Sequence, residues 1–158
     1  MFRKILIAVD EGGPARRAVE VGVELARTVG AAVAVLHVVD AAIAFRNDLC
    51  ITDEEMLKDL WERGKQLVTT TVEKLAPTLK CEPMIVEGDP AETIMETASQ
   101  WGADLIVLGS DGRGRLAHFL LGSTADAVIR RAPCPVLTAR QVEAAAGLAT
   151  TGRKTVAT

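Results

Sequence analysis

Aromatic residues are scarce in this sequence. Phe, Trp and Tyr make up 3% of the 158 residues, and there is no tyrosine. Proteins that bind single-stranded nucleic acid usually stack its bases on aromatic side chains, and this chain has few to offer. Basic residues are not in excess either, because 18 Lys and Arg face 21 Asp and Glu, for a net charge of −3. A basic face is the usual mark of a nucleic-acid partner, so we expect no nucleic-acid binding.

Long apolar runs and paired cysteines are also missing. No stretch approaches the roughly 18 apolar residues of a membrane-spanning helix, so we expect no membrane insertion. Cys50, Cys81 and Cys134 are far apart and form no CxxC pair, which favours reduced thiols in a cytoplasmic protein. Hydrophobic residues still make up 49% of the chain. A chain of this length predicts one domain whose core needs neither disulfide nor metal.

Short apolar runs alternate with amphipathic segments along the chain. The runs at 4–9, 31–39, 82–86, 104–108 and 136–139 predict strands, and the spacing of apolar residues predicts helices over 14–29, 52–76, 90–101 and 121–131. Thr52 is the expected N-cap of the second helix, and Ala125, Val128 and Ile129 are expected to face inward from the fourth. This alternation predicts an α/β fold of three layers, a parallel sheet with helices on both faces. Residues 40–51 show no clear period, and we treat 141–158 as a tail on a domain of residues 1–140.

A glycine-rich, basic loop follows the fourth predicted strand. It spans Gly109 to Arg115, and Gly122, Ser123 and Thr124 stand near the start of the next helix. Ligands of parallel α/β sheets bind beyond the carboxyl ends of the strands, and glycine loops and helix N-termini suit phosphate. Two such elements indicate a polyphosphate. On spacing alone, a plain connecting loop with Ser123 as a helix cap is the competing interpretation.

The spacing Gly109-x2-Gly112-x9-Gly122-Ser123 resembles the ATP-binding motif of the universal stress protein family. Residues 4–10, 36–39, 87–91 and 134–137 are similar to other segments of that family, in the same order. The resemblance covers about residues 2–140. It implies a Rossmann-like five-stranded parallel sheet of order 3-2-1-4-5 and a homodimer formed through the last strand.

The resemblance also implies a binding site for ATP, or for ADP or AMP in the same place. Adenine is expected at Val9, Asp10 and Val38. Ribose and phosphates are expected along the glycine motif, at Gly109, Gly112, Arg113, Gly122, Ser123 and Thr124.

The sequence departs from the family pattern at two places. Asp111 stands inside the motif, and a carboxylate beside a triphosphate is unfavourable unless a divalent cation bridges them. Either Mg²⁺ binds there, with Asp10 and Asp111 as its ligands, or Asp111 points outward. The first turn, Glu11-Gly12-Gly13, also lacks a serine that is common in the family.

The function that these features favour is that of a nucleotide-sensing regulatory module in stress response, acting on a protein partner that the sequence does not identify. One alternative is a slow ATPase or autokinase that uses the same site, with Ser123 or Thr124 as phosphoacceptor. Another is an interaction protein that holds AMP or no nucleotide. We assign no catalytic residue, because no serine has a recognisable His–Asp partner. His37, inside an apolar strand, is expected to be a structural histidine.

Overall fold

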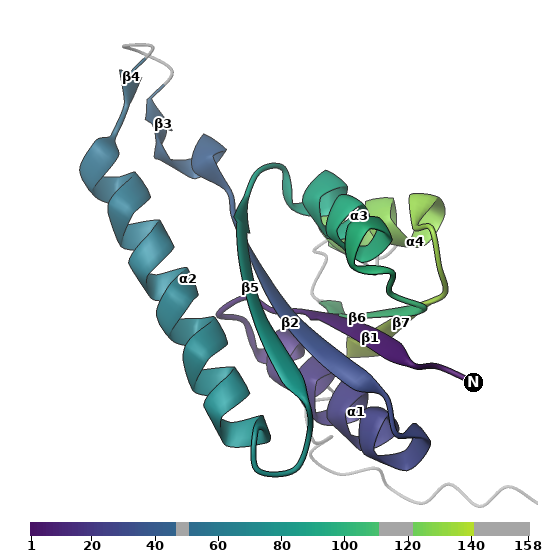
Figure 1. The fold of residues 1–158 in the computed structure, drawn as a ribbon. Helices are drawn as coiled ribbons and strands as arrows, with labels where there is room; N and C mark the ends of the chain where they lie inside the picture. The colour runs from purple at the N-terminus through teal and green to yellow at the C-terminus, as the bar shows by residue number, and fades with distance from the viewer. Residues whose placement is uncertain (47–50, 111–121, 141–158) are drawn as a thin grey trace, which may run out of the picture.

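The computed structural model describes residues 1–46, 51–110 and 122–140. Five parallel strands form one sheet in the order β5-β2-β1-β6-β7 (Figure 1), which confirms the order 3-2-1-4-5. The strands are β1 (Lys4–Ala8), β2 (Ala32–Val39), β5 (Cys81–Glu87), β6 (Leu105–Ser110) and β7 (Val136–Arg140). The helices are α1 (Gly13–Val29), α2 (Glu54–Leu75), α3 (Pro90–Trp101) and α4 (Ser123–Arg131). No helix in these ranges is both long and apolar enough to cross a membrane.

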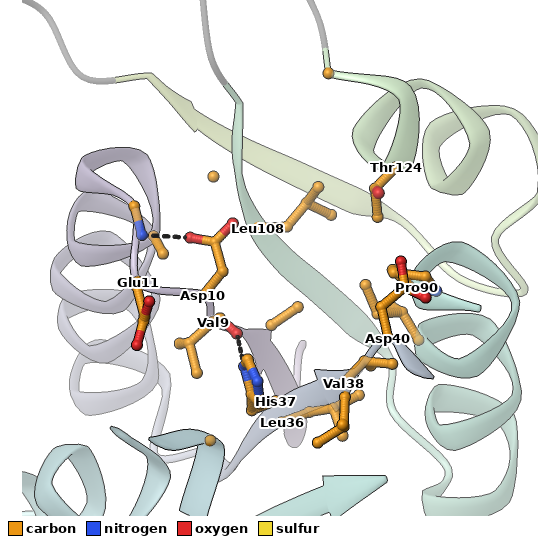
Figure 2. A pocket seen from close by; sticks show the side chains of 18 of the residues that line it. Val9, Asp10, Glu11, Leu36, His37, Val38, Asp40, Pro90, Leu108 and Thr124 are labelled. Carbon is orange, nitrogen blue, oxygen red and sulfur yellow. Dashed lines mark hydrogen bonds between the residues drawn. The ribbon is translucent and has the colours of Figure 1, made fainter. Parts of the chain in front are cut away.

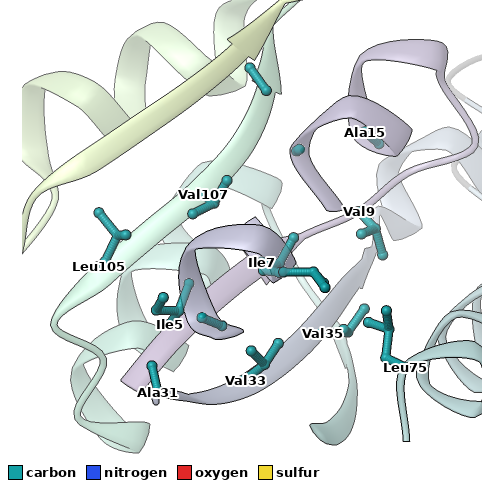
Figure 3. Close-up of a cluster of buried hydrophobic side chains, with 14 of the residues drawn as sticks. Ile5, Ile7, Val9, Ala15, Ala31, Val33, Val35, Leu75, Leu105 and Val107 are labelled. Atoms are coloured by element: carbon teal, nitrogen blue, oxygen red, sulfur yellow. The ribbon is translucent and has the colours of Figure 1, made fainter. Parts of the chain in front are cut away.

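The sheet separates two hydrophobic cores. Side chains alternate along each strand, so Ile5 and Ile7 pack toward α1 and α2 whereas Leu6 and Ile106 pack toward α3 and α4. Figure 3 shows the first cluster, in which strand residues gather beneath α1. The central strands are therefore covered on both faces, which explains why they are continuous apolar runs rather than alternating ones.

Most helix ends lie where the sequence predicts them. Pro14 stands in the first turn of α1, where the missing proline N–H costs nothing. Gly30 and Gly102 end α1 and α3 with φ of 72° and 73°, a left-handed conformation that glycine adopts without strain. Asp89 caps α3 and accepts a hydrogen bond from the Glu92 N–H at 3.0 Å.

Three local predictions were wrong. The N-cap of α2 is Asp53, which accepts from the Met56 N–H at 3.0 Å, whereas Thr52 belongs to a small antiparallel pair, β3 (Phe45–Arg46) with β4 (Ile51–Thr52). Strands of two residues are too short to produce a period. The last helix begins at Ser123 rather than 121. Ile129 is 42% exposed, because it is turned by about 100° from Val128, which takes the buried position.

The two edges of the sheet differ in their capacity to pair with another strand. The β5 edge contains Pro83, which has no N–H to donate to a further strand. Two of its carboxylates are also engaged by tryptophans, since Trp101 donates to Glu82 at 3.1 Å and Trp61 donates to Glu87 at 2.9 Å. The β7 edge contains no proline.

Candidate functional site

A pocket of about 460 Å³ opens at the carboxyl edge of the sheet. It lies where β1 and β6 diverge, which is where the strand order reverses, because β2 and β5 follow on one side of β1 and β6 and β7 on the other. Such a switch point is the usual ligand site of a parallel α/β sheet. In Figure 2, Asp10 and Glu11 of the β1–α1 turn lie on one side of the pocket, and Thr124 and Pro90 lie across it.

The structure brings together every predicted binding residue that it describes. The pocket lining includes Val9, Asp10, Val38, Gly109, Gly122, Ser123 and Thr124. The other predicted residues, Gly112, Arg113 and Asp111, lie outside the described residues. The role of each residue toward a nucleotide stays a prediction.

Two helices point uncapped N-termini at this pocket. The N-caps of α1 and α4 are Gly12 and Gly122, and neither provides a side-chain cap. By contrast, α2 and α3 are capped by the carboxylates of Asp53 and Asp89. The first N–H groups of a helix need an acceptor, and an anion supplies one while also complementing the helix dipole. The arrangement suits phosphate, and suits it best at α4, because Pro14 removes one N–H from α1.

The two described glycines of the motif, Gly109 and Gly122, have different surroundings, so glycine serves a different purpose at each position. A Cβ on Gly109 would lie 2.5 Å from the carbonyl carbon of Pro14 and 2.7 Å from the nitrogen of Ala15, so glycine lets α1 approach β6. Gly122 has φ of −61° and ψ of 155°, which any residue adopts, and a Cβ there would meet nothing within 4 Å. Neither glycine has a positive φ. The room beside Gly122 is open pocket space.

Three described carboxylates line the pocket. Asp10 and Glu11 belong to the β1–α1 turn, whereas Asp40 follows β2 and lies across the pocket, near Pro90 and Thr124 (Figure 2). Among the described lining residues, the one arginine is Arg63. Arg63 is already engaged, at 3.6 Å from Glu11 and 3.0 Å from Asp59. Phosphates should therefore lie away from this turn.

The Asp10 carboxylate already accepts a hydrogen bond within its own turn. Its Oδ1 accepts a hydrogen bond from the Gly12 N–H at 2.8 Å. Within the described ranges, no three His, Cys, Asp or Glu side chains gather as a metal site would need. Magnesium bound by Asp10 and Asp111 therefore stays a prediction.

The backbone of Val38 forms a hydrogen-bonding edge on the pocket wall. The register of β1 and β2 ends at Ala8 and Leu36, and the Val9 N–H donates to the Leu36 carbonyl at 2.8 Å. Backbone groups in a parallel strand alternate between its two neighbours, so Val38 turns its N–H and C=O toward β1. Because β1 has ended at that level, this donor–acceptor pair faces the pocket.

Sequence reasoning missed the part of the wall that comes from α2 and α3. Leu60, Arg63 and Gly64 line the pocket from α2, and Pro90 and Ile94 line it from α3. Their helical spacing indicates only which residues turn inward, not which turns reach the sheet edge. His37 was expected to be structural. It is hydrogen-bonded through Nδ1 to the Val9 carbonyl at 2.9 Å, and it also lines the pocket.

Residues 1–140 match the model of the universal stress protein family. The chain belongs to this family. A universal stress protein of Thermus aquaticus is 34% identical over 140 residues, which cover 89% of this chain and all of the relative. The solved structure of the universal stress protein UspA from Lactobacillus plantarum is similar at 30% identity with a TM-score of 0.75, covering 87% of this chain and 97% of that one.

A more distant universal stress protein has a ligand in its structure. The Arabidopsis thaliana protein has AMP bound, and it shares the fold with a TM-score of 0.67 at 24% identity, covering 89% of this chain and 92% of that one. At this identity, the likeness bears on the fold only.

Proposed function

We propose that this universal stress protein binds ATP in the pocket between β1 and β6 and acts as a nucleotide-sensing regulatory module in the cytoplasm. The observation that carries the proposal is that one pocket joins two complementary features. These are the free backbone edge of Val38 and the uncapped N-terminus of α4 at Gly122. Its volume of about 460 Å³ lies in the usual range for small-molecule sites, roughly 300–1,000 Å³.

The position of each nucleotide part follows from the hydrogen-bonding groups of the pocket. The base belongs against Val38, because a purine edge carries donors and acceptors that a backbone N–H and C=O can satisfy. The phosphates belong at Gly122, Ser123 and Thr124, where the first helix N–H groups have no side-chain cap. The AMP bound by the Arabidopsis protein shows that this fold accommodates an adenine nucleotide, and the triphosphate rests on the glycine motif. Mg²⁺ would arrive with the phosphates.

Binding rather than turnover fits the side chains near the proposed phosphate position. Ser123 and Thr124 are the nearest hydroxyls, and hydrolysis or autophosphorylation would need a base within reach of one of them. His37, a histidine of the pocket, uses Nδ1 on the Val9 carbonyl and lies at the proposed base end. The alternative function is that of a slow ATPase or autokinase, and a phosphate-release assay would distinguish an ATPase from a protein that only binds ATP.

A route from the pocket to the surface passes through Ile43. This residue of η1 (Ala41–Ala44) lines the pocket and is 61% exposed. A ligand that contacts Ile43 would favour one placement of η1, and a partner that contacts the same residue would sense it.

We further propose a homodimer through β7. The backbone of β7 continues the sheet at an edge without proline, whereas Pro83 interrupts the other edge. An unpaired strand edge is a template for another strand, and two β7 strands would pair about a twofold axis.

Isothermal titration calorimetry on nucleotide-free protein tests the proposed ligand. We expect ATP to bind with a Kd near 1 µM, about −8 kcal/mol, and AMP to bind more weakly because it lacks the β- and γ-phosphates. GTP serves as the control for base recognition. Folded, nucleotide-free protein that binds no adenine nucleotide would refute the proposal.

A further inference from the structure

The carbonyl of Val9 is the next acceptor in the hydrogen-bond ladder between β1 and β2, just beyond the last paired residues. The Val9 N–H donates to Leu36, so by regular alternation the Val38 N–H would donate to the Val9 carbonyl one step further. That bond is not formed, since the register stops at Ala8 and Leu36. Instead, His37 Nδ1 lies 2.9 Å from the Val9 oxygen (Figure 2).

This contact fixes what His37 does chemically. A carbonyl oxygen only accepts hydrogen bonds, so Nδ1 carries the proton and donates it. Val9 is buried, with 7% of its surface exposed, and a buried carbonyl without a donor is costly. The side chain of His37 therefore supplies the Val9 carbonyl with a donor in the place of the Val38 N–H.

We propose that His37 is a positioning residue for base recognition, which holds the Val9 carbonyl and so keeps the Val38 backbone N–H and C=O open to the base. The inference rests on the proposed nucleotide site. Without the His37 side chain, the Val38 N–H would donate to the Val9 carbonyl and extend the pairing of β1 and β2 by one hydrogen bond. That N–H would then no longer be available to the base.

The opposite helix is shaped to admit this ring. Gly64 of α2 is buried beside His37, and a Cβ there would overlap Cδ2 of the imidazole and lie 2.9 Å from Nε2. Glycine inside a helix lowers helix stability relative to alanine. The observed contact gives a reason for this glycine, because any side chain at position 64 would displace the ring that bonds Val9.

The consequence for specificity follows from the order of the groups. Adenine presents an acceptor, N1, beside a donor, the N6 amino group, which match a backbone N–H and C=O. Guanine presents a donor at N1 beside an acceptor at O6, the reverse order. A site that hydrogen-bonds one edge rejects the other because its own groups are left unpaired. His37 thus governs the preference for adenine without touching the base.

The test compares His37→Leu with His37→Asn. Leucine fills space but donates nothing, whereas asparagine places an N–H near the position of Nδ1. We expect His37→Leu to lower ATP affinity at least about tenfold and to lower the preference for ATP over GTP. We expect His37→Asn to keep both near their wild-type values. Gly64→Ala keeps the histidine and displaces it, so it should weaken ATP binding even though alanine favours the helix. Wild-type affinity and base preference in His37→Leu would overturn the proposal.

Two measurements on ligand-free protein separate this inference from the nucleotide proposal. Nitrogen-15 NMR should find the proton of neutral His37 on Nδ1. Amide hydrogen exchange should find the Val38 N–H unprotected in the wild type and protected in His37→Leu, where the ladder has closed. An Nε2 proton, or a Val38 amide already protected in the ligand-free wild type, would overturn the positioning role even if ATP binds. If the wild type binds no nucleotide, the ligand proposal fails, while the exchange result still decides whether His37 holds the strands apart.

Discussion

Gly109→Ala tests whether the close approach of α1 to β6 builds the pocket. The added Cβ would lie 2.5 Å from the carbonyl carbon of Pro14, and 2.7 Å from both the Pro14 oxygen and the Ala15 nitrogen. Ordinary contact between carbon atoms is about 3.5–4.0 Å. All three neighbours are backbone atoms, so no rotamer change relieves the overlap. The first turn of α1 must therefore move away from β6 by about 1 Å, given that contact distance.

The expected cost follows from overpacking of a well-packed interior, which is typically about 1–3 kcal/mol. A loss of about 2 kcal/mol would lower Tm by about 4–8 °C in a protein of this size. Gly109, Pro14 and Ala15 all line the pocket, so the same movement widens the site. We expect ATP affinity to fall about tenfold, which is about 1.4 kcal/mol.

Thermal unfolding and calorimetry with ATP measure the two effects, and Gly122→Ala is the matched control. Gly122 belongs to the same sequence motif, but a Cβ there meets nothing within 4 Å, so its stability should stay within about 0.5 kcal/mol of the wild type. If Gly109→Ala unfolds at the wild-type temperature, the reasoning from close approach is wrong. If both variants lose stability equally, the motif acts through something other than this contact.

Four further outcomes are expected. Gly122→Val should keep the wild-type Tm but lose ATP binding, since its side chain would enter open pocket space; unchanged affinity by calorimetry would place the phosphates elsewhere. Thr138→Pro removes an N–H that, by alternation from the Pro135 carbonyl bonded to Ile106, points out of the sheet, so it should turn the dimer into a monomer in sedimentation without lowering Tm; a wild-type monomer at micromolar concentration would contradict the β7 interface. Wild-type phosphate release should stay far below a typical enzyme rate of about 10 s⁻¹; a rate near that value, lost in Asp10→Asn, would make the protein an ATPase. Burial raises the pKa of the Cys81 and Cys134 thiols above their ordinary 9.0, so iodoacetamide should modify both slowly in folded protein, and urea titrations should show stability intact below about pH 9 and falling as the pH rises through the folded-state pKa.

The sequence by itself determined the layers of this fold. Residues 5–7 and 105–108 are continuous apolar runs because they are buried on both faces, and that burial is visible in the composition of the sequence. Gly30, Gly102 and Asp89 mark helix ends because their conformations or side chains act within one turn of the chain. The family resemblance then supplied the strand order and the list of site residues, which the pattern of apolar residues alone does not contain.

Tertiary structure decided how the site is built, because its contacts join distant segments. Gly109 and Gly122 look alike in the motif, yet only Gly109 has a backbone neighbour, Pro14, at contact distance. His37 reads as a core residue of β2, and only the ending of β1 beside it shows that its ring holds the Val9 carbonyl. Gly64 lies 27 positions further along the chain in an unremarkable helical pattern. Its reason is the imidazole facing it, a contact that depends on where α2 crosses the sheet and that no local rule of sequence specifies.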